Sequence, residues 1–451
     1  MREIFSLENR YRCMALAEAA LALAEAELGL IPRWAAREIA EFAARGRIDP
    51  SEVASREKEI GHETMALVLT IADSVGEAGG YVHYGATSSD ILDTASALQV
   101  KQASSIVLSK MARLIEIIVD RGEETLGITA LGRTHGMAAL PIPFGFKFAV
   151  WADMMVRNAL RFSAAVRRAC RGKMSGAVGT MAAFSGVGRE LQDRIMEILG
   201  LEPAPISTQV VPRDSLAELI LSMALTSSTL DAMANEVRNL QRTEIGEVRE
   251  PFRPSRQVGS STMPHKRNPI MSEKVCGLAR VMRSLALAAL ENVVLEHERD
   301  LTNSSVERVI VPEAFLLLDE QLTTMIRVLE GLEIDEEAIE RNLERAGGFI
   351  MAERVMMELA KSIGRQRAHE VLRRLSMRAY EEGRDLSEVL AEDEVISSTL
   401  GSRLADLLDP NSYLGEGREV ASSIFSRARA LLPLLREISS RLAEPPRLGR
   451  G

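Results

Sequence analysis

The sequence predicts an all-α protein, and three observations support that prediction. Aromatic residues make up only 4% of the 451 residues, while helix-favouring Ala, Leu, Glu, Arg and Met dominate. Apolar residues recur at helical spacing in long segments. At 1.5 Å per residue each would be roughly 40–50 Å long, and such helices need neighbours to cover their apolar faces. We expect a central bundle of five helices at about 92–124, 145–170, 213–245, 269–297 and 305–332.

Shorter helices are predicted on both sides of this bundle. The first runs from about residue 8 to 28 and ends at Gly29. A Gly-rich stretch at 79–90 precedes the bundle, and beyond Gly331 the helices shorten again. We therefore expect an N-terminal helical domain at 1–91, the bundle at 92–335 and a C-terminal helical domain at 336–451. Its last residues, 444–451, have little to bury and are predicted to form a disordered tail.

Composition excludes several classes of protein. The net charge of −9 argues against a nucleic-acid-binding surface over the whole molecule. Three cysteines that lie far apart indicate reduced thiols in a cytoplasm. No signal peptide and no run of 18 uncharged apolar residues occurs, so we expect a soluble cytoplasmic protein without a membrane partner. No Walker A, G-x-G-x-x-G, H-E-x-x-H or zinc-ligand spacing is present, so we expect no metal, flavin or nicotinamide cofactor.

Histidine is the side chain best suited to moving protons near neutral pH. Only His369 lies in an ordinary amphipathic helix, and the other five lie in Gly/Ser/Thr-bearing segments or at helix ends: His62, His83, His135, His265 and His297. This distribution favours proton-transfer chemistry. For any single histidine, a capping or packing role stays open.

The segment from Phe252 to Ser272 carries four Lys/Arg residues and no Asp or Glu, in a chain that is acidic overall. Asn268-Pro269 predicts a helix start, with Asn as the cap and Pro at the first helical position. A cationic loop that leads into a helix N-terminus favours bound carboxylate or phosphate. We therefore expect an anionic small-molecule substrate. A basic surface linker is the alternative.

Two further segments place chemistry-bearing residues at connections between helices. Gly132–Gly136 puts His135 on a tight turn beside the Thr134 hydroxyl. Residues 298–308 combine two arginines with a pair of serine hydroxyls. Interhelical capping with ion pairs is the alternative for the second segment.

Residues 259–269 read Gly-Ser-Ser-Thr-Met-Pro-His-Lys-Arg-Asn-Pro. This segment resembles the loop that marks the fumarase/aspartase superfamily, Gly-Ser-Ser-x-Met-Pro-x-Lys-x-Asn-Pro. The His-Lys-Arg version looks like adenylosuccinate lyases or carboxymuconate cycloisomerases, but the cycloisomerases usually have tryptophan where His135 stands. Other segments also look like the adenylosuccinate lyase family, and the resemblance spans residues 5–425: 83–91, 133–136, 175–179, 207–209, 241–247, 298–301, 304–308 and 413–415.

The resemblance implies a β-elimination that splits a succinylated amine into the free amine and fumarate. In this family the substrates are adenylosuccinate, which gives AMP, and succinylaminoimidazole carboxamide ribotide, both in purine biosynthesis. Ser260 would be the base, with Ser261 as the alternative, and His135 the acid. Glu273 would orient and charge the histidine, and His62 and His83 would support it. The remaining candidates are substrate contacts: Thr87, Ser88, Lys266 and Asn268 around the succinyl group, Thr134 beside His135, Gln209, and Arg299, Ser304 and Arg308 at the ribose phosphate.

The resemblance also implies a homotetramer with a twenty-helix core and active sites built from three chains. The sequence departs from the family pattern on the nucleotide side. Gly61 and Glu63 replace the usual Arg and Asp around His62, Met137 stands where Gln is frequent, and Arg10-Tyr11 lies within the first helix rather than before it. A related lyase or cycloisomerase with another head group therefore stays open. A non-catalytic tetramer is disfavoured because Ser260, His135 and Lys266 are all present.

Overall fold

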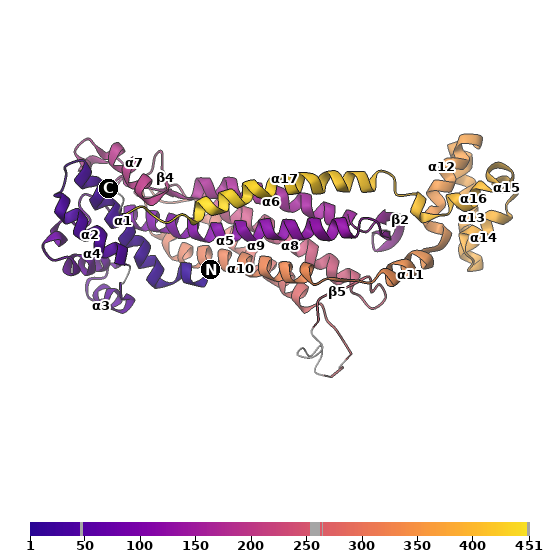
Figure 1. Ribbon diagram of the computed structural model, residues 1–451, viewed down its shortest axis with the longest axis horizontal. Helices are drawn as coiled ribbons and strands as arrows, with labels where there is room; N and C mark the ends of the chain where they lie inside the picture. The colour runs from indigo at the N-terminus through magenta and orange to yellow at the C-terminus, as the bar shows by residue number, and fades with distance from the viewer. Residues whose placement is uncertain (46–47, 253–261, 264, 449–451) are drawn as a thin grey trace.

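The computed structural model describes residues 1–45, 48–252, 262–263 and 265–448. It is an elongated, almost entirely helical molecule, with a compact helical unit at each end of a long bundle (Figure 1). The all-α prediction is confirmed. The described part of the chain also contains three two-stranded sheets, which were not predicted: β1 (Thr129–Thr134) with β2 (Met137–Pro143), β3 (Arg171–Gly172) with β4 (Glu202–Pro203), and β5 (Val248–Arg249) with β6 (Glu333–Ile334).

The bundle contains the five predicted helices, each within six residues of its expected ends. They are α5 (Ser88–Glu124), α6 (Phe146–Ala169), α8 (Asp214–Leu240), α9 (Ile270–Glu291) and α10 (Thr302–Glu330). A sixth long helix, α17 (Gly417–Ala443), returns along α5 and α6 (Figure 1). Gly122 of α5 permits this approach, because a Cβ there would lie 2.3 Å from the Phe425 ring of α17.

The unit near the N-terminus packs around α1 (Leu7–Glu27), whose Ser6 cap accepts a hydrogen bond from Asn9 N. Alanines along α1 are almost fully buried and let neighbouring helices approach closely. The other elements of this unit are η1 (Arg2–Phe5), α2 (Arg33–Arg45), α3 (Pro50–Ile60), α4 (Glu63–Ser74), η2 (Gly76–Tyr81), η3 (Ala182–Phe184) and α7 (Gly188–Leu199).

A separate apolar cluster holds the opposite unit together. Its elements are α11 (Glu336–Ala346), η4 (Gly347–Met351), α12 (Ala352–Ile363), α13 (Arg365–Glu382), α14 (Leu386–Glu392), α15 (Glu394–Leu400), α16 (Arg403–Leu407) and η5 (Pro410–Ser412). After α17 the chain reaches the N-terminal unit again. Although the sequence predicts disorder from residue 444, Glu444 O accepts from Lys101 Nζ at 3.0 Å and Arg447 N donates to Ile198 O at 2.7 Å. These contacts hold the segment through Leu448 against the N-terminal unit.

One helix in the described part of the chain, α8, is long and apolar enough to cross a membrane. It runs through the middle of the bundle, and 61% of its most apolar stretch is buried there. Leu219, Ile220 and Met223 are buried at 0–1% exposure. These contacts account for its apolar composition, because a core helix buries apolar side chains on several faces.

Candidate active site

The N-terminal end of α5 brings Ser88 and His62 together. His62 is the N-cap of α4, and its Nδ1 accepts a hydrogen bond from Met65 N at 3.2 Å. Because Nδ1 accepts this hydrogen bond, the proton of the neutral ring is on Nε2. This Nε2 lies 3.3 Å from Ser88 Oγ. His62 therefore donates toward the start of α5, where Thr87 and Ser88 were predicted to contact the succinyl group.

The side chain of Asp90 holds the start of α5 in place. Its fully buried carboxylate accepts from Thr87 N at 2.9 Å and from Ser175 N at 2.8 Å, and it pairs with the fully buried Lys173. The Thr87–Ser88 turn and the 175–176 turn consequently share one anchor. The buried ion pair has a partner for each charge, as a charged group in a protein interior requires.

His83 lies on the adjoining turn with φ = +64° and contacts a buried carboxylate of α1. Its Nδ1 is 2.7 Å from Glu18 Oε1, and the Glu18 side chain is fully buried. Burial by itself lowers the pKa of His83, but the hydrogen bond and charge of Glu18, with Asp90 behind, raise that pKa overall. His83 thus carries more positive charge near neutral pH than a free imidazole would.

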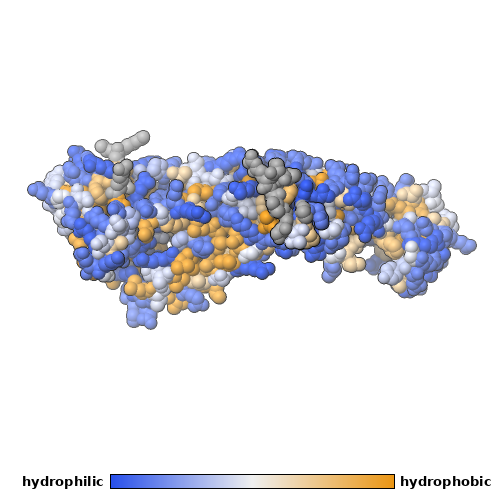
Figure 2. Space-filling view, turned by 90° about the horizontal axis from the view of Figure 1, so that it is seen from below, coloured by the Kyte–Doolittle hydropathy of each residue, from blue (hydrophilic) through white to orange (hydrophobic). Residues whose placement is uncertain are grey.

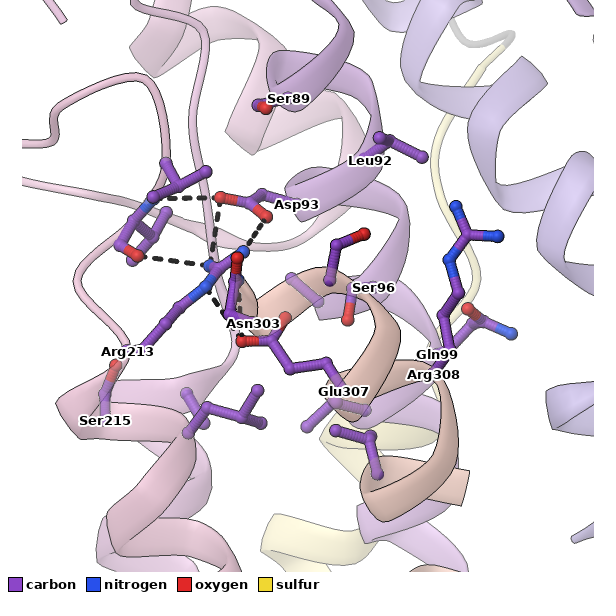
Figure 3. A pocket seen from close by; sticks show the side chains of 18 of the residues that line it. Ser89, Leu92, Asp93, Ser96, Gln99, Arg213, Ser215, Asn303, Glu307 and Arg308 are labelled. Carbon is purple, nitrogen blue, oxygen red and sulfur yellow. Dashed lines mark hydrogen bonds and ion pairs between the residues drawn. The ribbon is translucent and has the colours of Figure 1, made fainter. Parts of the chain in front are cut away.

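A cavity of about 280 Å³ opens between the first turns of α5, α8 and α10. Arg299, Ser304 and Arg308 line it, as the sequence predicted for a group that binds ribose phosphate. Arg299 Nη1 donates to Gln209 Oε1 at 2.6 Å, so a fourth predicted residue lies at the same place. Figure 3 shows this cavity with Arg308 pointing along its side.

A buried ion triad forms the opposite wall of the cavity. Arg213 lies between Asp93 and Glu307, with N–O distances of 2.7 and 3.0 Å (Figure 3). Burial raises the pKa of Glu307 in spite of Arg213, while Asp93 and Glu307 hold Arg213 charged. The triad ties the first turns of α5, α8 and α10 to one another.

His135 and Thr134 lie at the other end of the bundle, on the β1–β2 hairpin (Figure 1). Thr134 pairs with Met137, so His135 and Gly136 form a two-residue turn, with φ values of +54° and +75°. Positive φ at both central residues is the type I′ geometry that matches the strand twist of a hairpin. Thr134, His135 and Met137 are all exposed at the tip. Within one chain, His135 therefore lies far from His62 and His83.

A third group of predicted residues lies where the 252–269 connection enters α9: Lys266, Asn268 and Glu273. Lys266 N donates to Met263 O at 3.0 Å, and Gln241 Nε2 donates to Arg267 O at 3.1 Å. Glu273 is exposed in the first turn of α9. Ser260 and Ser261, the two candidate bases, lie outside the described residues.

The prediction that the α9 N-terminus is a free anion site is wrong. The cap position is Pro269 without a side-chain cap bond, and the carboxylate of Glu250 accepts from two N–H groups of the first turn instead. Glu250 accepts from Met271 N at 3.1 Å and from Ser272 N at 2.6 Å and is 5% exposed. β5 delivers Glu250 to this position, where its charge already complements the helix dipole. Lys266 and Asn268, predicted to contact the succinyl group, directly precede this turn.

Sequence reasoning missed Glu18, Asp90 and Glu250, three buried carboxylates that hold predicted site residues or the helix beside them. Asp90 alone left a signal, because Thr87-x-x-Asp90 has the spacing of a capping box. Glu18 and Glu250 reach partners far away in the chain, at His83 and Met271. In the described part of the chain, no cluster of three or more His, Cys, Asp or Glu side chains could hold a metal ion.

Comparisons with known proteins agree with this architecture. Residues 1–283 match a family profile described as "Lyase", and residues 348–424 match "Adenylosuccinate lyase C-terminus". An adenylosuccinate lyase of Pyrococcus horikoshii is 49% identical over 94% of both chains. An N-acetyl-S-(2-succino)cysteine lyase of Dickeya dadantii is 37% identical over 95% of this chain and 94% of its own. The solved 3-carboxy-cis,cis-muconate lactonizing enzyme of Pseudomonas putida has a TM-score of 0.88, with 31% identity over 95% and 97% of the two chains.

The fold and the matched profiles define a lyase of the fumarase/aspartase type. Within that superfamily, the chain belongs to the adenylosuccinate lyase family. The family predicted from residues 259–269 and the other segments is therefore confirmed, and so is the prediction of a lyase that releases fumarate.

Proposed function

We propose that this enzyme eliminates fumarate from adenylosuccinate to give AMP, and from succinylaminoimidazole carboxamide ribotide in the same way. The observation that carries the proposal is the arrangement around α5. The His62–Ser88 pair, suited to a succinyl carboxylate, lies at the same end of the bundle as the arginine-lined cavity, suited to a phosphate. A succinylated nucleotide carries both groups. The 49% identity to an adenylosuccinate lyase supports the same substrate.

In the proposed reaction, Ser260 removes a proton from the carbon beside a succinyl carboxylate, and the electron pair is delocalised into that carboxylate. Lys266 and Asn268 would stabilise the added negative charge, which is the main way enzymes lower such barriers. The C–N bond then breaks, its electrons go to nitrogen, and His135 protonates that nitrogen. Fumarate and the amine leave. Glu273 would orient His135, and His62 would support the catalytic groups. His83, Thr87, Ser88, Thr134 and Gln209 would hold the substrate.

We propose that these groups meet across subunits of a homotetramer. Thr87 and Ser88 lie at the start of α5 and His135 lies beyond its end, and a 37-residue helix is about 55 Å long. One chain therefore cannot bring His135 to Ser88. Joining the sites requires other copies, as the twenty-helix core of the resemblance implies.

An apolar area on the bundle supports such an assembly. Figure 2 shows it between the N-terminal unit and the grey segment. Exposed large apolar side chains of α8, α9, α10 and their connections are Leu225, Val281, Leu287, Leu290, Val293, Val294, Leu301 and Val309. An exposed patch of this kind marks an interaction surface. We also propose a cytoplasmic location. The expected division at residues 91 and 335 is kept as a proposal, with α7 joining the N-terminal unit and α17 joining the bundle.

Incubation of the purified protein with adenylosuccinate, with AMP and fumarate measured separately, tests the substrate. Equal amounts of both products are expected. The Dickeya dadantii relative favours one alternative, a succinylated thiol, and the Pseudomonas putida structure favours a lactonizing reaction on carboxymuconate. Turnover of N-acetyl-S-(2-succino)cysteine or carboxymuconate without turnover of adenylosuccinate would replace our assignment. Turnover of none of the three would favour a non-catalytic scaffold.

Hybrid assemblies test the shared site. His62→Ala and His135→Ala variants are each expected to be nearly inactive. Co-denatured and refolded at equal amounts, they should regain roughly a quarter of wild-type activity, because random assembly leaves about that fraction of sites with both histidines. Each variant refolded alone is the control. No recovery in the mixture, with tetramers formed, would contradict a site shared between chains.

A further inference from the structure

The cavity of Figure 3 is cationic on an acidic molecule. Five arginines and three carboxylates line it, whereas the whole chain has a net charge of −9. Not all five arginines can bind a ligand. Arg213 is bound by Asp93, Glu307 and the Val211 carbonyl, and Arg171 lies within 3.8 Å of Glu202. The remaining three are Arg10, Arg299 and Arg308.

Arg10 was set aside in the sequence because it lies within the first helix. In the structure it projects from the first turn of α1 to the cavity, where Glu63 holds it. Arg10 Nε lies 3.0 Å from Glu63 Oε1, and Arg10 Nη2 lies 3.1 Å from Glu63 Oε2. This two-bond pairing fixes the plane of the guanidinium.

The same carboxylate also holds Arg308. Glu63 Oε2 accepts from Arg308 Nη2 at 2.8 Å. The Glu63 side chain is 8% exposed, while Arg10 and Arg308 are 24% and 51% exposed. Burial would raise the pKa of Glu63, but the two arginines lower it overall, so the carboxylate stays ionised. One buried anion thus positions two partly exposed cations side by side.

The charges of this group match a phosphate. Arg10, Arg308 and Glu63 together carry one net positive charge, and Arg299 on the same wall adds a second. A phosphate monoester carries about −1.5 to −2 near neutral pH. Arg10 uses two of its five N–H groups on Glu63 and Arg308 uses one, so each keeps donors for a ligand. Glu63 and the two arginines that it holds all line this cavity.

We infer that Arg10, held by Glu63, is a further ligand of the substrate phosphate, beside Arg299 and Arg308. The inference rests on the proposed function for the identity of the nucleotide. It assigns a binding role to the Glu63 that replaces the usual Asp. This replacement therefore does not remove the phosphate site, because Glu63 organises its cations.

Equilibrium binding of AMP and of adenosine tests the inference, since the two ligands differ only in the phosphate. In Arg10→Ala we expect the Kd for AMP to rise about 10- to 100-fold, the usual range for losing a hydrogen bond to a charged group. The Kd for adenosine should stay within twofold. Arg12→Ala is the matched control, because Arg12 is exposed on the same helix and does not line the cavity. It should leave both constants unchanged.

Equal changes for AMP and adenosine, or the same AMP loss in Arg12→Ala, would overturn the inference. If thermal melting shows that Arg10→Ala does not fold, Arg10→Lys replaces it. Lys keeps the charge without the planar fork, so a smaller AMP loss with unchanged adenosine binding is expected, and no AMP loss would contradict the role of the fork. Wild-type turnover of adenylosuccinate is measured in parallel. Wild-type AMP binding without that turnover would refute the proposed function and leave the phosphate site standing.

Discussion

The two ends of the bundle present their predicted site residues in opposite ways. At the N-terminal end, His62, His83 and Arg308 each have a partner within the same chain, at Ser88, Glu18 and Glu63. At the other end, Thr134 and His135 project from a hairpin tip into solvent. The first group is organised before any substrate or partner arrives. In the second, the type I′ turn sets the backbone, and the side chains at the tip are exposed.

In the proposed homotetramer, this contrast corresponds to a division of labour between copies of the chain. Binding groups need several fixed contacts to hold a substrate, and one chain supplies them where α4, α5 and α10 meet. A proton donor needs only to be placed correctly, and a hairpin turn can deliver it into a neighbouring subunit. The exposed Met137 beside His135 fits the same view, since a large apolar side chain at a tip gains from being covered.

The sharpest test of the contrast is His135→Ala. Loss of a general acid typically lowers kcat by about 10²- to 10⁴-fold, while the N-terminal end should keep its ligand affinity. Steady-state kinetics with adenylosuccinate and equilibrium binding of AMP measure the two effects separately. His369→Ala is the matched control, an exposed histidine on α13. Near-normal turnover in His135→Ala would show that His135 is not the general acid.

A second test concerns the pH dependence of stability in the N-terminal unit, where α1 carries the buried Glu25. Burial, followed by the charge of Glu18, raises the pKa of Glu25 to about 8 from its ordinary value of 4.5. Between these values the unfolded chain releases a proton that the folded chain keeps. The free energy of unfolding therefore falls as pH rises from 4.5 to 8, by up to about 1.4 kcal/mol per pH unit from this group alone. Above pH 8 the loss levels off.

Glu25→Gln removes this ionisation, so the variant should lose less stability than the wild type between pH 5 and 8. Chemical denaturation at several pH values measures the difference. Glu27→Gln, on an exposed part of the same helix, should keep the wild-type slope. Parallel curves for Glu25→Gln and the wild type would show that Glu25 is ionised in the folded protein.

A third test is Glu18→Gln, which should uncouple His83. We expect kcat/KM to fall about tenfold, because the imidazole loses a charge-assisted hydrogen bond. The wild-type pair raises the pKa of His83, so its stabilisation is complete below the unfolded value of 6.5 and disappears as pH rises through the folded one. Glu18→Gln should therefore lose stability at pH 6 and less at pH 9. An unchanged pH profile would contradict the ion pair.

Much of this molecule could be predicted from its sequence, for identifiable reasons. Helical spacing over 25 residues or more is a strong local signal, so α5, α6, α8, α9 and α10 were all predicted within six residues. Predicted site residues that share a helix start, Ser304 and Arg308, were proposed from their motif, and they line the same cavity. The cavity between three first turns was not, because it depends on how α5, α8 and α10 pack.

The hairpin and the α9 cap show what local patterns cannot reveal. Residues 129–143 contain Gly, Ala and Pro rather than the β-branched run that marks a strand, so β1 and β2 were missed. His135-Gly136 held the clue, because a residue that tolerates positive φ followed by Gly suits a two-residue turn. At α9 the local signal favoured Asn268, but Glu250 caps the helix, 21 residues from its partner Met271. Competition from a distant carboxylate cannot be seen in a short window.

The substitution Glu250→Gln is expected to have the smallest effect. It concerns the N-terminus of α9, which lies between the two ends of the bundle. A neutral amide keeps the shape of the cap but loses the charge that complements the α9 dipole and the two N–H groups. We expect about 1 kcal/mol less stability. Because Lys266 and Asn268 directly precede this turn, kcat should fall severalfold while AMP affinity at the N-terminal end stays constant. Glu244→Gln, exposed on the same connection, is the control. If AMP affinity fell together with kcat, the start of α9 would also affect the phosphate cavity, in its own chain or in a neighbouring copy, and the independence of the two ends would be wrong.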